Sequence, residues 1–139
     1  FHVSTMLPFY PDDPQKLERK RHLGNDVVVV IFSESEEPFN PAWIRSEFNH
    51  VFCVVQKVPS NDDITYYKIG FAAKEGTNPF YPLLKKNPIF KKSAEFASML
   101  HLKLINAERS AMCAPGFAKK LSRTRKVLLT DCIQTHGKK

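Results

Sequence analysis

The order of apolar and polar residues along the chain predicts three strands. Residues 27–32 form an unbroken apolar run, Val-Val-Val-Val-Ile-Phe, which is typical of a strand buried on both faces. A second apolar run covers residues 51–58. After a turn at residues 59–63, residues 66–73 alternate with a period of two, which predicts a third strand that forms a hairpin with the second.

Helical segments are expected before and between the first two strands. The first helix is expected to begin at Pro14, capped by one of the two preceding aspartates, and to end near Leu23. A short helix is expected to hold Trp43, Ile44 and Phe48. Together with the strands, these segments predict an α/β fold, a central β-sheet with flanking helices, in a single domain that covers residues 1–139.

Two longer helices are predicted near the end of the chain. Ser93 is a suitable cap for a helix that places Phe96, Leu100, Leu104 and Ala107 on one face. Ala114-Pro115-Gly116 then breaks the helix. We expect the last helix to turn one set of residues inward (Phe117, Leu121, Leu128 and Cys132) and a basic set outward (Lys119, Lys120, Arg123 and Lys126). The tail at residues 137–139 is expected to fray.

The loop at residues 76–88 contains Phe80, Tyr81, Leu83 and Leu84. A loop with so many large apolar side chains is either folded onto the core or offered to a partner. The first alternative is favoured.

Composition and charge exclude several classes of protein. The net charge is +7, and residues 81–139 carry 13 Lys and Arg against 3 Asp and Glu. These charges could steer an acidic partner, an anionic membrane or a nucleic acid, and about half of them are expected to be only a solvated helix face. No apolar run is long enough to span a membrane, and any membrane contact is expected to be indirect. The three cysteines and five histidines have no metal-ligand spacing, so we expect no disulfide framework, no metal and a cytoplasmic location. Cys53 is expected to be a core residue.

The motifs of self-contained enzymes and of nucleotide binding are absent from the sequence. There is no GxxxxGK[ST] loop, GxSxG elbow, HExxH helix or GxGxxG turn. No module for nucleic-acid binding is present, so no nucleic acid is expected as a partner. We expect neither a nucleotide site nor a cofactor in this chain.

The most informative segment is the cationic run that ends in Gly24-Asn25-Asp26, directly before the first strand. Two interpretations are open. Gly24 can adopt a positive φ that stops the helix while Asn25 and Asp26 form the turn, or the corner can present the Asn25 amide to a partner. Spacing alone favours the structural interpretation.

Three sequence stretches point to a known family. Phe1 to Pro8, Lys20 to Asp26 and Phe48-Asn49-His50-Val51-Phe52 resemble the Rap/Ran-GAP domain, the GTPase-activating module of Rap GTPase-activating proteins and, more distantly, of tuberin. Two later stretches also resemble the Rap-directed branch, Ile105 to Glu108 and Arg123 to Arg125. Because Phe1 already lies inside the family motif, the chain is expected to be an N-terminally truncated fragment of a larger protein.

The resemblance implies roles for particular residues. Asn25 corresponds to the asparagine thumb, which enters the active site of the small GTPase and replaces a glutamine that Rap lacks. His22 corresponds to a residue that supports catalysis. Lys20, Arg21 and Asp26 correspond to flanking positions and are expected to contact the partner. The family uses no arginine finger, so Arg21 is not assigned that role.

The resemblance also implies a partner, a Rap-family small GTPase in its GTP-bound state, with Ral and Rheb less favoured. The family's dimerisation region lies outside this sequence, so a homodimer would form through residues that are missing here. An alternative function is a catalytically weak interaction module whose basic C-terminal half binds acidic proteins or phosphoinositide surfaces.

Overall fold

The computed structural model describes residues 1–137 of the chain, so the expected fraying of Lys138 and Lys139 lies outside the described residues. The elements are 3₁₀ helix η1 (Ser4–Met6), helix α1 (Leu17–Asn25), strand β1 (Val28–Ser33), 3₁₀ helix η2 (Pro41–Trp43), strands β2 (Val51–Val58), β3 (Tyr66–Ala73) and β4 (Ile89–Lys91), and helices α2 (Ala94–Cys113) and α3 (Pro115–His136). No helix within residues 1–137 is long and apolar enough to cross a membrane.

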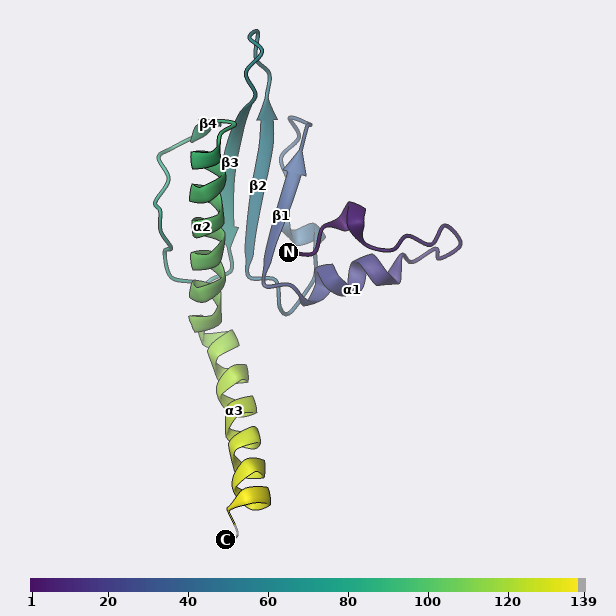
Figure 1. Cartoon of the computed structure of the whole chain (residues 1–139), viewed down its shortest axis with the longest axis vertical. Coiled ribbons are helices and arrows are strands. Elements are labelled where there is room, and N and C mark those ends of the chain that lie inside the picture. Colours follow the sequence, from purple (N-terminus) through teal and green to yellow (C-terminus); the bar gives the residue numbers. More distant parts are fainter. Residues whose placement is uncertain (138–139) are drawn as a thin grey trace.

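The four strands form one mixed sheet in the order β1-β2-β3-β4. β1 and β2 run parallel, and β3 pairs antiparallel with both β2 and β4. The predicted strands at 51–58 and 66–73 and their hairpin are therefore confirmed, and so is the α/β fold class (Figure 1). β4 was not predicted, because three residues carry too little pattern to stand out from a loop.

Helix α2 covers one face of the sheet (Figure 1). Ser93 caps it as predicted, because the Ser93 hydroxyl accepts a hydrogen bond from the Phe96 N–H. Phe96 and Leu104 pack against Cys53, Val55 and Ile69, and all five side chains are buried. The thiol of Cys53 is fully buried, as expected of a core residue, and burial raises its pKa to about 12.

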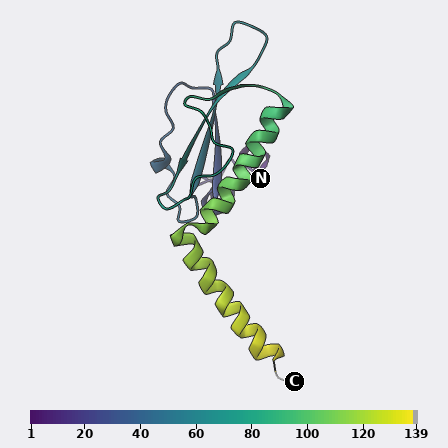
Figure 2. The same cartoon turned by 90° about the vertical axis from the view of Figure 1, so that its left-hand side faces the viewer.

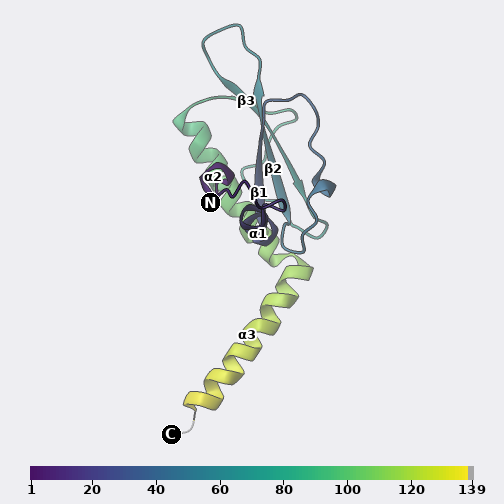
Figure 3. The same cartoon turned by 90° about the vertical axis from the view of Figure 1, so that its right-hand side faces the viewer.

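The connection from β1 to β2 covers the opposite face of the sheet (Figures 2 and 3). Phe39 lies 6.0 Å from Phe52, between ring centroids, and Trp43 packs on Phe39 with its ring edge-on. The short helix expected around Trp43 is only the 3₁₀ turn η2, which ends before Ile44 and Phe48. A parallel pair thus forms here without an α-helix in its connection.

Two expectations of burial are wrong. β1 is an outer strand of the sheet within the described residues, and Val30 and Phe32 are 42% and 57% exposed, so it is not buried on both faces. Leu128 of α3 is 63% exposed and Cys132 is also exposed, so neither points inward. Only the first turns of α3 reach the body of the domain, and the rest projects away from it (Figures 1 to 3).

The loop at residues 76–88 is partly folded onto the core and partly exposed, so each of the two alternatives holds for some of its apolar side chains. Phe80 and Leu84 pack against the core, whereas Tyr81 and Leu83 are 68% and 62% exposed. The loop is held by the buried Lys103 of α2, whose ammonium donates to the carbonyl oxygens of Phe80 (3.0 Å) and Pro82 (2.9 Å).

Candidate functional site

Helix α1 leaves the β1 edge of the sheet and carries the predicted catalytic corner at its C-terminus (Figures 1 and 3). Its start is fixed by Asp13, whose carboxylate accepts the backbone N–H groups of Gln15 (2.9 Å) and Leu17 (2.8 Å). These hydrogen bonds lower the pKa of Asp13. The predicted start is wrong: the helix begins at Leu17 rather than at Pro14, and its N-cap residue is Lys16, although Asp13 still binds the first helical N–H.

The C-terminal end of α1 differs from the structural interpretation of the sequence. The helix runs through Gly24 and ends at Asn25, and Asp26 is the first extended residue, with φ −75° and ψ 145°. Gly24 is not among the residues with positive φ. The helix therefore does not stop at a left-handed glycine, and another feature must satisfy the carbonyl groups of its last turn.

Asn25 is exposed, and its side chain makes no hydrogen bond with any residue in the range 1–137. The carboxamide consequently keeps both its donor and its acceptor groups available to another molecule. An amide in this position, at the end of a helix and next to a strand, is presented from a fixed backbone.

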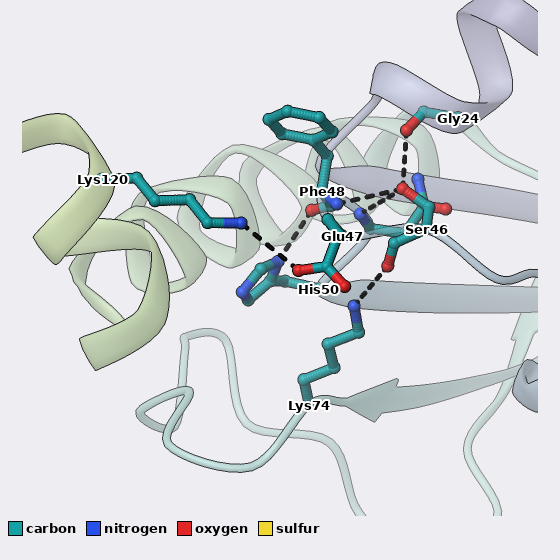
Figure 4. Close-up of polar contacts among 8 residues, drawn as sticks. Gly24, Ser46, Glu47, Phe48, His50, Lys74 and Lys120 are labelled. Atoms are coloured by element: carbon teal, nitrogen blue, oxygen red, sulfur yellow. Dashed lines mark hydrogen bonds and ion pairs between the residues drawn. The ribbon is translucent and has the colours of Figure 1, made fainter. Parts of the chain in front are cut away.

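The last turn of α1 is capped by side chains of the segment at residues 46–50. The Ser46 hydroxyl donates to the Gly24 carbonyl oxygen at 2.6 Å (Figure 4). The Asn49 amide nitrogen donates to the carbonyl oxygens of Leu23 (2.8 Å) and Asp26 (2.5 Å). These side-chain donors take the place of the left-handed glycine cap.

The 46–50 segment is itself tied to two other parts of the fold, the residue after β3 and helix α3, and Figure 4 shows the polar contacts to both. The Lys74 ammonium donates to the Ser46 carbonyl oxygen at 2.6 Å. Glu47 forms an ion pair with Lys120 of α3 at 3.3 Å. His50 is buried; its Nδ1 lies 2.7 Å from the Phe48 carbonyl oxygen, and its ring packs edge-on against Phe117 of α3.

His22 and Asp26 are brought together by the N-terminal residues. The ring of His2 packs against that of His22, with 4.2 Å between centroids and the two planes tilted by 38°. Nδ1 of His2 lies 2.9 Å from one Asp26 carboxylate oxygen. Asp26, expected to contact a partner, is thus already engaged within the chain, although its side chain remains 31% exposed.

Lys20 and Arg21 both lie on the exposed side of α1. Arg21 makes an ion pair with Glu18 one turn earlier, at 3.5 Å, with the Arg21 side chain 66% exposed. Lys20 has no acidic partner within residues 1–137. The predicted site residues therefore share one end of α1, with Lys20, Arg21 and Asn25 exposed and His22 half-buried.

A groove of about 510 Å³ borders this corner, between the N-terminal residues, α1, β1 and α2. His22 and Asp26 line it, whereas Asn25 does not. Within residues 1–137, no three His, Cys, Asp or Glu side chains are grouped as a metal site requires. The chemistry that this site can supply is that of a free amide beside cationic side chains.

Sequence reasoning missed Ser46 and Asn49 as parts of the site. Asn49 lies within the Phe48 to Phe52 stretch on which the resemblance rests, but nothing in the local pattern shows that its amide reaches Leu23, at the end of a helix 26 residues earlier. His2, 24 residues before Asp26, was missed for the same reason.

Known proteins of one family match this chain in sequence and in structure. The sequence profile of the family described as Rap/ran-GAP matches residues 1–126. The chain is 42% identical over 137 residues to human GTPase-activating Rap/Ran-GAP domain-like protein 3, covering 96% of this chain and 13% of the relative. A GTPase-activating protein of Dictyostelium discoideum is 42% identical over 143 residues, covering 99% of this chain and 14% of the relative.

Two further matches extend the comparison. Human signal-induced proliferation-associated 1-like protein 2 is 42% identical over 135 residues, which cover 96% of this chain and 8% of the relative. The solved structure of the TSC2 GAP domain superimposes with a TM-score of 0.59 at 26% identity, covering 72% of this chain and 51% of that chain. The chain thus spans a small part of the curated relatives. These matches show that it belongs to the Rap/Ran-GAP domain family.

Proposed function

We propose that this chain stimulates GTP hydrolysis by a Rap-like small GTPase and that Asn25 is the group it inserts into the partner's active site. The observation that carries the proposal is the free amide of Asn25, exposed at the end of a helix whose neighbouring carbonyl groups are all bound. Membership of a GTPase-activating family supports a small GTPase as the partner.

Such a residue needs to supply only a hydrogen-bond acceptor and a hydrogen-bond donor. The partner holds GTP and Mg²⁺, and hydrolysis depends on orienting the attacking water and on stabilising charge spread over the phosphoryl oxygens. The oxygen of a carboxamide accepts a hydrogen bond from the water, and its nitrogen donates to a phosphoryl oxygen. Asn25 supplies both groups from one side chain, and His22 supports the helix that carries it.

Single-turnover hydrolysis by GTP-loaded Rap, Ral and Rheb, with and without this chain, tests the partner. Rap is expected to respond most strongly, because the motifs resemble the Rap-directed branch. Stronger stimulation of Ral or Rheb under the same conditions would contradict the choice of partner but leave GTPase activation itself intact.

The variant Asn25→Ala tests the residue. Stimulated hydrolysis is expected to fall by roughly 10² to 10⁵, the range found for groups that act only in the transition state. The melting temperature and the affinity for GTP-loaded Rap should change little, because the Asn25 side chain is exposed and makes no hydrogen bond within residues 1–137. Asn61→Ala is the matched control, an exposed asparagine in the turn between β2 and β3, at the opposite end of the sheet (Figure 1).

If Asn25→Ala and Asn61→Ala stimulate hydrolysis equally, the assignment of the thumb is wrong. If instead Asn25→Ala unfolds while its folded fraction keeps full activity, Asn25 has only a structural role.

A second function has one observation in its favour. α3 projects from the domain with exposed Lys119, Arg123, Arg125 and Lys126, a basic surface suited to acidic proteins or phosphoinositides. Replacing Lys119, Arg123 and Lys126 by Gln tests it. Loss of binding to vesicles containing phosphoinositides, with GTP hydrolysis unchanged, is expected if this surface acts independently of Asn25.

A further inference from the structure

We propose that Ser46 and Asn49 are positioning residues, which fix the backbone on both sides of Asn25 and so aim its side chain at the GTPase. This inference rests on the proposed function of Asn25. It assigns to the 46–50 segment a role in the rate of hydrolysis that is separate from docking.

The carbonyl groups on both sides of Asn25 accept hydrogen bonds. The His22 carbonyl oxygen accepts the Asp26 N–H at 3.1 Å, which is the closing hydrogen bond of α1. The next two carbonyls, of Leu23 and Gly24, receive side-chain donors from Asn49 and Ser46. The carbonyl after Asn25, that of Asp26, receives the second donor of Asn49. The backbone is held before and after Asn25, while the Asn25 side chain is left free.

The residue types suit this task. The Asn49 amide is fully buried and offers two N–H donors on one nitrogen, which matches two carbonyl oxygens on either side of a single residue. Its own oxygen has no partner within residues 1–137. A buried amide with an unpaired oxygen is an uncommon arrangement, and it is explained if the two donor bonds are what this position requires.

The positions of Ser46 and Asn49 are set by the remainder of the fold rather than by α1. Asn49 lies two residues before β2, and the N–H of the intervening His50 donates to the Val27 carbonyl oxygen at 2.8 Å. Lys74, which follows β3, holds the Ser46 carbonyl (Figure 4). α1 has no buried residue of its own, so these bonds, with the contacts of His2 to His22 and Asp26, carry the orientation of its last turn.

Loss of a donor is therefore expected to loosen the last turn without detaching α1 from its partner surface. The exposed side chains that meet the GTPase stay in place, but Asn25 spends less time in the productive orientation. Such a change lowers kcat and leaves KM nearly constant. The orientation of the Asn25 side chain matters for the transition state of hydrolysis more than for binding of the GTPase.

The experiment uses two variants, each with a matched control from α2. Ser46→Ala removes a hydroxyl that donates to the Gly24 carbonyl at 2.6 Å and also accepts the Phe48 and Asn49 N–H groups. Ser110→Ala removes a donor bond of the same length, 2.6 Å, to the Asn78 carbonyl. Asn49→Asp replaces the amide that donates to Leu23 by a carboxylate, which only accepts hydrogen bonds. Asn106→Asp makes the same replacement in α2, where the Asn106 amide donates to the Tyr81 carbonyl oxygen at 2.9 Å. Ser46→Thr keeps the hydroxyl and serves as the rescue.

Hydrolysis by Rap is measured against the concentration of each variant, so that kcat and KM separate. Ser46→Ala is expected to lower kcat about five- to tenfold and Asn49→Asp on the order of 100-fold, with KM within about twofold of the wild type. The two α2 controls and Ser46→Thr should retain most of kcat. Equal kcat values for Ser46→Ala and Ser110→Ala overturn the proposal, as does a change confined to KM.

Hydrogen exchange gives a second readout that does not depend on activity. In Ser46→Ala the Asp26 amide, which closes α1, is expected to exchange faster than in the wild type, while amides of α2 keep their protection. Unchanged exchange at Asp26 would contradict the proposal even if hydrolysis fell. If wild-type chain stimulates no GTPase, the proposed function fails, yet faster exchange would still show that Ser46 orders this turn.

Discussion

Asn25 and Asn49 have the same side chain, but their surroundings give the two amides opposite roles. The Asn49 amide is fully buried and both its donors are bound, so it orders the backbone. The Asn25 amide is exposed and unbound within residues 1–137, so it can bind a partner. Resemblance to a family identified Asn25 from the sequence, whereas the contacts of Asn49 depend on the folded chain. A local pattern contains no information about a bond that spans 23 residues.

The two cations beside Asn25 are expected to differ in their contribution to encounter with an acidic partner. Lys20→Ala should raise KM more than Arg21→Ala, because Glu18 already neutralises part of the Arg21 charge. Both effects should shrink as ionic strength rises. Hydrolysis measured over a salt series checks this, with Lys57→Ala, an exposed lysine on β2, as control. A fall in kcat at constant KM would mean that these residues shape α1 instead.

The buried thiol of Cys53 makes stability depend on pH. Its pKa is raised from 9.0 to about 12 by burial, so between these values the unfolded chain loses the thiol proton and the folded chain keeps it. This contribution to stability is complete below about pH 9 and is lost as pH rises, by at most about 1.4 kcal/mol per pH unit. Burial lowers the pKa of the neighbouring Lys103, which acts in the opposite direction up to pH 10.5.

Comparison with Cys53→Ala isolates the thiol, because Lys103 is present in both proteins. Urea unfolding at about pH 7 and about pH 10 should show a wild-type advantage that shrinks at the higher pH. An advantage that stays constant would contradict the raised pKa of the thiol.

At the scale of helices and strands, sequence patterns were informative where an element packs on one defined face. β2, β3 and α2 follow their predicted bounds, since Cys53, Ile69 and Phe96 lie on faces that meet in one core. β1 and α3 show the limit of such patterns. The valines of β1 and the apolar residues along α3 show from the sequence that a face is apolar. They do not show whether another helix or strand within residues 1–137 packs on that face.

α3 is consequently expected to divide into a stabilising start and a dispensable remainder. Phe117→Ala should destabilise the domain by about 3 kcal/mol, because the ring is buried against Phe48 and His50. Leu128→Ala should change stability by less than about 0.5 kcal/mol. Urea unfolding measures both. Comparable losses in the two variants would show that Leu128 is packed against the domain in solution.

At the scale of the whole molecule, one part of the sheet is covered and another part is exposed. α2 covers the centre of the sheet, but β1 exposes Val30 and Phe32 along an edge that has no neighbouring strand within residues 1–137. An exposed, apolar edge strand is a template for pairing with another chain. The isolated chain is therefore expected to self-associate at high concentration.

Sedimentation velocity over a range of concentrations tests this expectation. Phe32→Lys should reduce self-association without loss of stability, because the added charge lies at the exposed edge. Leu129→Lys, at a position 62% exposed on α3, is the control. The opposite pattern would place the association on α3.

The separation of α1 from the 46–50 segment also has an evolutionary consequence. The side chains proposed to face a partner, among them Lys20 and Arg21, lie on one stretch of sequence, and those that bind the helix end, Ser46 and Asn49, lie on another. Mutation can therefore alter recognition without disturbing orientation. Relatives that diverged toward other GTPases are expected to vary on the exposed surface of α1 and to retain donor side chains at the positions of Ser46 and Asn49.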